Sequence, residues 1–148
     1  MTRVLIFLAA TSLTACSTPD QAAPTKAAAA AGMVETPMAE VEAKLASGDC
    51  VVYDANGAET REKHGVVKGA KLLSSYNAYA ASELPASKDT DLVFYCGSTH
   101  CTASDQAAER AIMEGYTHVS VMREGIAGWT KAGKPTVPYH AEKKSNEG

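Results

Sequence analysis

The sequence from residue 91 to residue 114 reads DLVFYCGSTHCTASDQAAERAIME, and it combines a strand, a short loop and a helix. Residues 91–95 are mainly aliphatic and aromatic, which is typical of a strand. Residues 102–114 have helical periodicity, with Thr102 as the expected N-cap and Gly115 at the C′ position. The apolar stripe of this helix comprises Ala103, Ala107, Ala108, Ala111 and Ile112. A strand that leads through a loop into a helix is a unit of an α/β fold.

Strands and helices alternate on both sides of this stretch. The patterns predict a helix that ends at Gly48, a strand over 49–54, helices over 58–64 and 76–84, a strand around 71–73, a last strand over 118–122 and a helix from 125 to Gly133. Thr36 is the expected N-cap of the first helix, and Pro37 is its expected first residue. This order predicts an α/β domain with a mainly parallel sheet, helices on both faces and right-handed crossovers.

Cys96 ends the strand over 91–95 and is followed closely by the helix over 102–114. In an α/β sheet this is the carboxyl edge, where ligands bind. The unpaired N–H groups and the positive dipole end of the helix favour the thiolate, which is the nucleophilic form of cysteine. Cys96 is therefore the predicted catalytic residue, and a half-buried structural cysteine is the alternative.

The first fifteen residues have the features of a secretory signal peptide. Arg3 supplies a positive start, and residues 4–13 form an uncharged, mostly apolar run that is too short to span a membrane. The following Leu13-Thr14-Ala15-Cys16 resembles the lipobox of bacterial lipoproteins, which implies cleavage before Cys16 and lipidation of that residue. Ordinary cleavage at a nearby alanine is the alternative. Ser17 after the cysteine is typical of lipoproteins sorted to the outer membrane.

The mature chain divides into three parts by composition. Residues 16–33 are rich in Ala, Pro and Thr and are predicted to form a lipidated tether to the membrane. Residues 34–139 suit one domain, and residues 140–148 form a polar C-terminal tail. Without residues 1–15 the chain carries 13 basic and 17 acidic side chains, a net charge of −4. No basic patch suggests binding to nucleic acid.

Several motifs between residues 36 and 138 resemble those of rhodanese-like (sulfurtransferase) domains. They are Val52-Tyr53-Asp54 after the first helix, Gly65-x-x-x-Gly69-Ala70, the strand that ends in Tyr95-Cys96, the helix that ends at Gly115-Tyr116, and the ending Gly125-Ile126-x-x-Trp129-x-x-Ala132-Gly133-x-Pro135. The last motif is the most specific, because it defines several residue types over eleven positions. It concerns the fold more than the activity.

The resemblance implies sulfur transfer at Cys96, which occupies the position of the family's nucleophile. Its thiolate would take sulfane sulfur from a small donor, hold it as a persulfide and pass it to a thiol acceptor, without a cofactor. The implied active loop, which would bind the anionic sulfur through its backbone N–H groups, comprises Gly97, Ser98, Thr99, His100, Cys101 and Thr102.

The chain also departs from the family pattern. The loop contains no Arg or Lys, so a polysulfide or a low-molecular-weight persulfide is a better predicted donor than doubly charged thiosulfate. In the family an Arg commonly lies two residues after the Asp of the strand, which is Asp54 here. This chain has Asn56 at that position, and Arg61 is the candidate to take the place of the missing Arg. The family's Gly-His-Ile-Pro-Gly-Ala is replaced by residues 65–70, Gly-Val-Val-Lys-Gly-Ala, which lack the His and the Pro.

Cys101 lies in the loop of a protein that is predicted to face an oxidising periplasm. It can act as a resolving thiol that attacks a persulfide on Cys96, it can form a static disulfide, or it can remain unpaired. His100 is either a thiolate-stabilising group or a solvated loop residue, and Cys50 is expected to be a small buried residue. Cys96, His100 and Cys101 lack a fourth ligand with recognisable spacing, so no metal site is predicted.

Three functions from different classes therefore remain open: a lipid-anchored sulfurtransferase of the cell envelope, a non-catalytic rhodanese-like binding module, and a thiol-disulfide protein that uses Cys96 and Cys101. A phosphatase would need a longer loop with a terminal Arg to hold phosphate, and Cys101 occupies that position.

Overall fold

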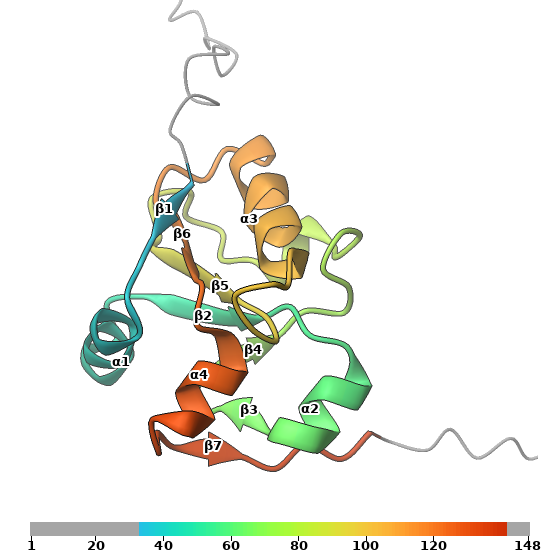
Figure 1. The fold of residues 1–148 in the computed structure, drawn as a ribbon. Helices are drawn as coiled ribbons and strands as arrows, with labels where there is room; N and C mark the ends of the chain where they lie inside the picture. The colour runs from blue at the N-terminus through green and yellow to red at the C-terminus, as the bar shows by residue number, and fades with distance from the viewer. Residues whose placement is uncertain (1–32, 142–148) are drawn as a thin grey trace, which may run out of the picture.

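A five-stranded parallel sheet forms the centre of the protein (Figure 1). The computed structural model describes residues 33–141, in which the strand order is β1-β6-β5-β2-β4 and every neighbouring pair of this sheet is parallel. The strands are β1 (Val34–Glu35), β2 (Val51–Asp54), β4 (Lys71–Leu72), β5 (Leu92–Tyr95) and β6 (Val119–Met122). The sheet confirms the predicted fold class.

Helices cover both faces of this sheet. The helices are α1 (Met38–Ser47), α2 (Ala58–His64), α3 (Ala103–Met113) and α4 (Gly125–Lys131). Figure 1 shows α3 on one face and α1 and α4 on the other, with α2 beside α4. Gly48 and Gly115 follow α1 and α3 with φ angles of 77° and 92°. Both glycines therefore supply the left-handed turn that the sequence predicts at the end of each helix.

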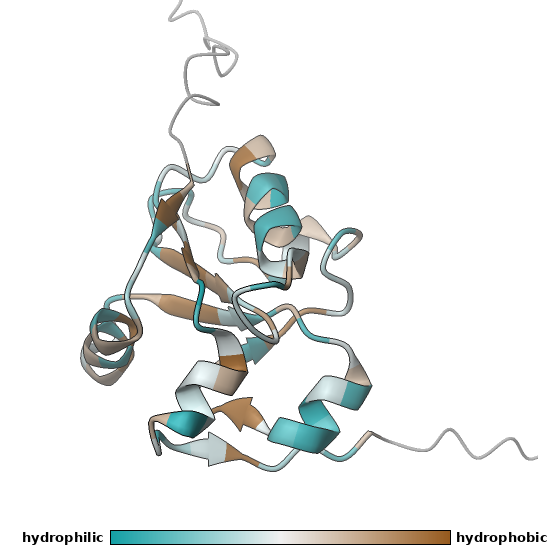
Figure 2. Ribbon diagram, viewed as in Figure 1, coloured by the Kyte–Doolittle hydropathy of each residue, from teal (hydrophilic) through white to brown (hydrophobic). Residues whose placement is uncertain are grey.

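The central strand β5 contributes to both halves of the hydrophobic core. Leu92 and Phe94 pack with the alanines of α3, whereas Val93 and Tyr95 pack in the cluster that contains residues of α1 and α4. All four side chains are fully buried. Figure 2 shows the corresponding concentration of apolar residues on the central strands. This alternation explains why β5 is apolar along its whole length.

Three short strands are not apparent from the sequence patterns. β1 extends the sheet beside β6, and β3 (Val66–Val67) pairs antiparallel with β7 (Thr136–Val137) in a separate ribbon. Each has only two residues, so side-chain alternation cannot reveal it. Gly65 precedes β3 with φ 73°, and a Cβ atom there would lie 2.8 Å from the carbonyl oxygen of Val137. The ribbon therefore needs a glycine at position 65.

Two helix predictions were wrong in detail. Residues 76–84 contain only a 3₁₀ turn, η2 (Ala81–Glu83), because the Glu83 carboxylate accepts hydrogen bonds from the N–H groups of Ser74 and Ala80 and holds the segment as a loop. Pro37 is the N-cap of α1 and not its first helical residue. The N–H of Thr36 donates to the Val121 carbonyl at 3.0 Å, so the extended conformation of β1 continues up to the helix.

The predicted signal peptide (1–15) and the lipidation site Cys16 lie outside the described residues, as do all but the last residue of the tether (16–33) and most of the tail (140–148). Within residues 33–141, no helix has the length and the apolar composition needed to cross a bilayer.

A buried polar network joins the carboxyl ends of β2 and β5. The Arg61 guanidinium donates to Asp54 Oδ1 at 3.1 Å and to the carbonyl oxygens of Asp54 and Leu73 at 2.9 and 3.0 Å. The Tyr95 hydroxyl donates to the other Asp54 oxygen and accepts from the N–H of Val67. Asp54 is completely buried, so its charge depends on these partners. Arg61, the candidate substitute named from the sequence, is thus the counter-ion of Asp54.

Replacing Arg61 with methionine is expected to lower the free energy of unfolding by about 3–5 kcal/mol, because Asp54 would remain buried without its counter-ion. Urea unfolding of the two proteins measures this difference. Lys71→Met removes the same charge from an exposed position of β4 and is expected to change stability by less than about 0.5 kcal/mol. Equal effects of the two substitutions would contradict a stabilising role for the Asp54–Arg61 pair.

Candidate active site around Cys96

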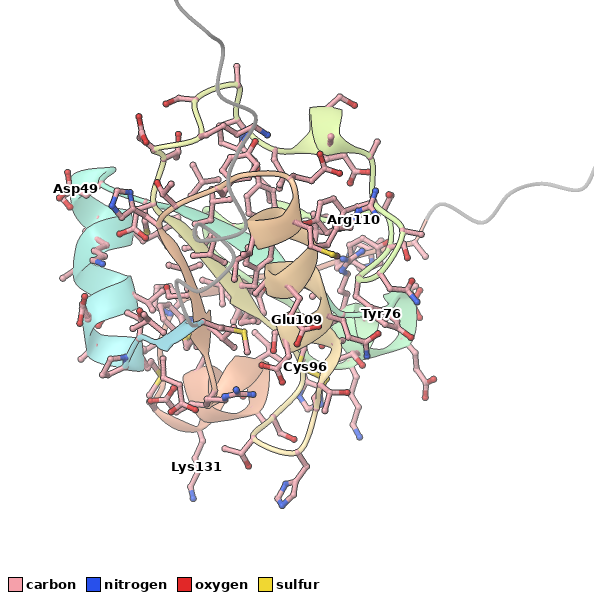
Figure 3. The ribbon with its side chains drawn as sticks, turned by 90° about the horizontal axis from the view of Figure 1, so that it is seen from above. Asp49, Tyr76, Cys96, Glu109, Arg110 and Lys131 are labelled. Carbon is pink, nitrogen blue, oxygen red and sulfur yellow. A yellow bond between two sulfur atoms is a disulfide. The ribbon has the colours of Figure 1, made fainter. Side chains whose placement is uncertain are left out.

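Cys96 directly follows β5 at the carboxyl edge of the sheet and faces the first turn of α3. Figure 3 labels it at this end of the helix. Only 2% of the residue is exposed, and its sulfur lies 3.3 Å from the hydroxyl oxygen of Ser104. The N-terminal dipole and the Ser104 hydroxyl both favour negative charge on this sulfur when it is a free thiolate.

Cys96 and Cys101 form a disulfide that closes the loop, with Cα atoms 6.3 Å apart. The N–H of Cys101 also donates to the Ser98 carbonyl at 3.0 Å, which folds the loop back toward β5. Cys101 is only partly buried, in contrast to Cys96. The sequence left three states open for this pair, and in the structure the two sulfur atoms are bonded to each other.

The N-terminus of α4 holds the first half of the loop. The carbonyl oxygens of Cys96 and Gly97 accept hydrogen bonds from the N–H groups of Ile126 and Ala127 at 2.9 and 3.0 Å. Several loop N–H groups, in contrast, have no protein acceptor among the described residues; they belong to Gly97, Ser98, Thr99, His100 and Thr102. Unpaired amides of successive loop residues are the kind of donor from which a backbone nest for an anion is built.

Gly125 makes the close contact between α4 and the loop sterically feasible. Its φ angle is 60°, and a Cβ atom would lie 2.6 Å from the Cys96 carbonyl oxygen and 2.8 Å from the Ser98 nitrogen. A side chain would therefore be strained in conformation and would also collide with the backbone of the loop. The glycine that the sequence motif contains at this position has a direct role in the geometry of the site.

Asn56 lies beside the loop at the end of β2. It is 9% exposed, its N–H donates to Asp54 at 2.7 Å, and its Oδ1 would lie 3.8 Å from a Cβ atom at Gly97. The side-chain nitrogen of Asn56 is buried and has no hydrogen-bond partner among the described residues. Asn56 thus places a neutral side-chain amide next to the loop, with its oxygen nearest to Gly97, at the position where the family resemblance led us to expect an Arg.

Ser104 is the site residue that sequence reasoning missed. It is 2% exposed and lies on the buried face of α3 with Ala107, Ala108 and Ala111. Ser104 lies three residues before Ala107 and four before Ala108, so the helical pattern places a polar residue on the apolar face of this helix. This was the signal in the sequence that could have identified it. Its burial is explained by its contact with the Cys96 sulfur.

The other predicted loop residues are more exposed. Thr99 and His100 are exposed, and their side chains lie within hydrogen-bond distance of each other at 3.3 Å. Thr102 is the N-cap of α3, as expected, but its side chain makes no capping hydrogen bond. His100 therefore corresponds to the solvated loop residue among the alternatives. Within residues 33–141, no group of three His, Cys, Asp or Glu side chains is arranged to hold a metal ion.

Cys50 is remote from this chemistry. It is 8% exposed in the cluster formed by β2, α1 and α4, and burial together with the negative charge of Asp91 raises the pKa of its thiol to about 11. The expected role as a small buried residue is confirmed, and the thiol is unreactive at neutral pH.

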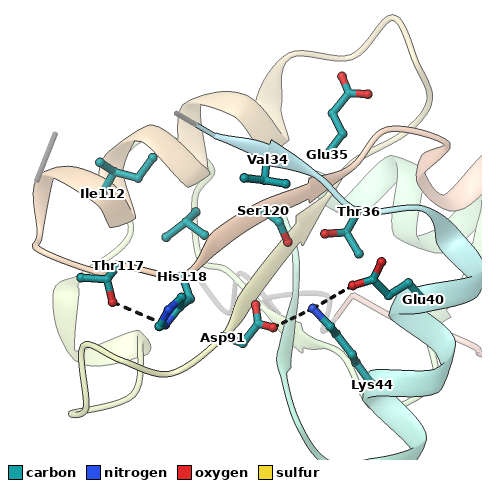
Figure 4. A pocket seen from close by; sticks show the side chains of 11 residues that line it. Val34, Glu35, Thr36, Glu40, Lys44, Asp91, Ile112, Thr117, His118 and Ser120 are labelled. Atoms are coloured by element: carbon teal, nitrogen blue, oxygen red, sulfur yellow. Dashed lines mark hydrogen bonds and ion pairs between the residues drawn. The ribbon is translucent and has the colours of Figure 1, made fainter. Parts of the chain in front are cut away.

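A cavity of about 500 Å³ lies at the opposite, amino edge of the sheet (Figure 4). Three of its charged groups pair with one another: Lys44 Nζ contacts Asp91 Oδ2 at 2.9 Å and Glu40 Oε1 at 3.0 Å, and these contacts raise the pKa of Lys44. The cavity lies at the beginnings of β5 and β6, whereas Cys96 lies beyond the end of β5. We therefore assign it no part in the chemistry of Cys96.

Fold and motifs together define the family. A family model described as the rhodanese-like domain matches residues 37–132, and the chain belongs to this family. The search of curated proteins produced no match.

Solved structures show the same fold at low sequence identity. A Rhodopseudomonas palustris protein described as a possible tyrosine phosphatase shares 23% identity over 74% of this chain and 88% of its own, with a TM-score of 0.59. The rhodanese-like domain of an Anabaena protein shares 22% sequence identity over 79% of this chain and 87% of its own, with a TM-score of 0.59. The homodimeric polysulfide-sulfur transferase of Wolinella succinogenes shares 17% sequence identity over 81% of this chain and 88% of its own, also with a TM-score of 0.59.

Replacing Gly125 with alanine is expected to cost about 1–3 kcal/mol more than replacing Gly133 with alanine. Both glycines have positive φ angles, 60° and 70°, so both substitutions include the cost of a left-handed alanine. Only the Cβ at 125 meets the loop, because no atom of the described residues lies within 4 Å of a Cβ at 133. Urea unfolding of the two variants measures the difference. Equal losses in the free energy of unfolding would show that the loop moves away from the added Cβ without an energetic cost.

Proposed function

We propose that this protein is a sulfurtransferase in which Cys96 carries a persulfide. The observation that carries the proposal is the placement of the Cys96 sulfur beside Ser104 and the first turn of α3, in a loop whose N–H groups are available to an anion. Membership of the rhodanese-like family and the polysulfide-sulfur transferase name of a structural relative support sulfur transfer as the chemistry.

The proposed reaction has two covalent steps. When the disulfide is reduced, the Cys96 thiolate attacks a sulfane sulfur of the donor, a bond forms between the two sulfurs, and the rest of the donor leaves as a thiolate or a shorter polysulfide. The outer sulfur of the persulfide is then attacked by a thiol acceptor. The loop N–H groups and Ser104 stabilise the negative charge on sulfur in both steps.

The absence of a cation in the loop favours a polysulfide or a low-molecular-weight persulfide as donor. Residues 96–104 include no Lys or Arg, and the side chain of the nearby Asn56 is a neutral amide. The sulfonate oxygens of thiosulfate concentrate charge that a fixed cation would have to neutralise. A phosphatase activity, as suggested for the Rhodopseudomonas relative, would face the same lack of an anion-binding cation.

We further propose that the protein works in the bacterial cell envelope. The signal-peptide pattern of residues 1–15, the lipobox ending at Cys16 and the polar tether over 16–33 support a lipid anchor facing the periplasm, and Ser17 supports the outer membrane. In this arrangement the membrane contact is made by the lipid alone. The proposed partners of the domain are small sulfur donors and thiol acceptors.

Intact-mass analysis tests the persulfide. The full chain carrying Cys16→Ser and Cys101→Ser, reduced and then exposed to polysulfide, is expected to gain one sulfur atom on Cys96. Adding Cys96→Ala should remove the adduct and the transfer activity, whereas adding Cys50→Ala should change neither, because the Cys50 thiol is buried. No adduct on Cys96 would favour the non-catalytic binding module instead.

A second test concerns the donor. The chain is expected to use polysulfide efficiently and thiosulfate poorly, as measured by kcat/KM for each donor. Thr99→Arg places a cation on the exposed side of the loop and is expected to raise kcat/KM for thiosulfate about tenfold, equivalent to about 1.4 kcal/mol of added anion binding. Thr99→Gln, which adds length without charge, should have no such effect. Equal use of both donors by the chain with Thr99 in place would contradict the proposed donor class.

A further inference from the structure

The two cysteines of the loop differ in their access to solvent. Cys96 is 2% exposed, and its sulfur is enclosed by Ser104 and by the Cys101 carbonyl oxygen, which lies 3.2 Å away. Cys101 is partly buried and packs only at the border of the core. An external thiol therefore meets Cys101 before it can meet the sulfur of Cys96.

The pair also needs no rearrangement of the backbone to react. A Cα separation of 6.3 Å is within the range of protein disulfides, and the loop is closed by the hydrogen bond from the Cys101 N–H to Ser98. Cys101 is thus positioned to reach the sulfur of Cys96 at a high effective concentration. An acceptor from solution has to diffuse in and pass the loop.

We propose that Cys101 discharges the Cys96 persulfide inside the loop and releases sulfide, and that an external dithiol then reopens the disulfide by attack on Cys101. This inference rests on the proposed persulfide of Cys96. It replaces transfer to an outside acceptor by reduction of sulfane sulfur, so the product is sulfide and the consumed partner is a dithiol reductant, either a small dithiol or a protein with two adjacent thiols.

Atoms and electrons balance over the cycle. The Cys101 thiolate attacks the inner sulfur of the persulfide, the bond between the inner and outer sulfurs breaks, and the outer sulfur leaves with the electron pair as hydrosulfide. The product is the Cys96–Cys101 disulfide seen in the structure. The dithiol reductant then returns two electrons, becomes a disulfide itself and restores both thiols.

The direction of the reductive step follows from the surroundings of the two sulfurs. Attack on Cys101 makes Cys96 the leaving group, and the leaving thiolate is received by the Ser104 hydroxyl and the N-terminus of α3. Attack on Cys96 would have to occur at a buried sulfur and would expel Cys101. The first route also restores the nucleophile of the next cycle directly.

A single-turnover experiment tests the internal discharge. The full chain carrying Cys16→Ser is reduced, freed of reductant, exposed to one equivalent of polysulfide without a thiol acceptor, and compared with the same chain carrying Cys101→Ser. The chain with Cys101 is expected to lose two hydrogens and to retain no added sulfur, whereas the Cys101→Ser chain is expected to keep one added sulfur on Cys96. A sample without donor controls for oxidation by air, and Cys50→Ser serves as the matched cysteine control that should behave like the parent.

The outcomes separate this inference from the proposed function. If both chains accumulate the same Cys96 persulfide, sulfur transfer stands and the internal discharge is overturned. If neither chain gains sulfur on Cys96 and no disulfide forms, the persulfide chemistry itself fails. A disulfide in the parent without any persulfide in the Cys101→Ser chain also overturns both, because the dithiol would then be oxidised by another route.

A trapping experiment tests where the reductant enters. The oxidised chain is treated with limiting glutathione, quenched with acid and an alkylating reagent, and mapped by fragment-ion mass spectrometry. Glutathione is expected predominantly on Cys101, with Cys96 alkylated as the released thiol. Glutathione predominantly on Cys96 would overturn the assigned direction of attack.

Discussion

Burial of β5 on both faces is the constraint on which the rest of the domain depends. Its side chains alternate between the core under α3 and the core under α1 and α4, so the strand needs helices on both sides. It also pairs in parallel with β2 and β6, which buries both of its edges. The residue after such a strand has to emerge at the carboxyl edge of the sheet, and that residue is Cys96.

Separate contacts then determine how the sulfur is presented. The network of Asp54, Arg61 and Tyr95 joins the ends of β2 and β5 below the loop, and the first amides of α4 hold the loop carbonyls from the side. Ser104 approaches the Cys96 sulfur from α3. Cys101 is the more exposed residue of the disulfide, and this asymmetry underlies the proposed redox cycle.

Local patterns predicted the long elements well and the short ones poorly. β5 and α3 have enough residues to show their periodicity, whereas β1, β3 and β7 have two residues each and are created by pairing with distant segments. The segment 76–84 resembled a helix locally, but hydrogen bonds to the Glu83 carboxylate hold it as a loop with one 3₁₀ turn. Tertiary contacts therefore override weak local preferences.

The sequence by itself determined the α/β class, the family motifs and the position of Cys96 at the end of a strand, because these depend on residue order and local periodicity. Only the tertiary structure decided that Cys96 meets Cys101 and Ser104, that Asn56 lies beside Gly97, and that Gly125 touches the loop. These contacts depend on loop conformation and on the approach of separate elements, to within an ångström, and no spacing along the chain encodes such distances.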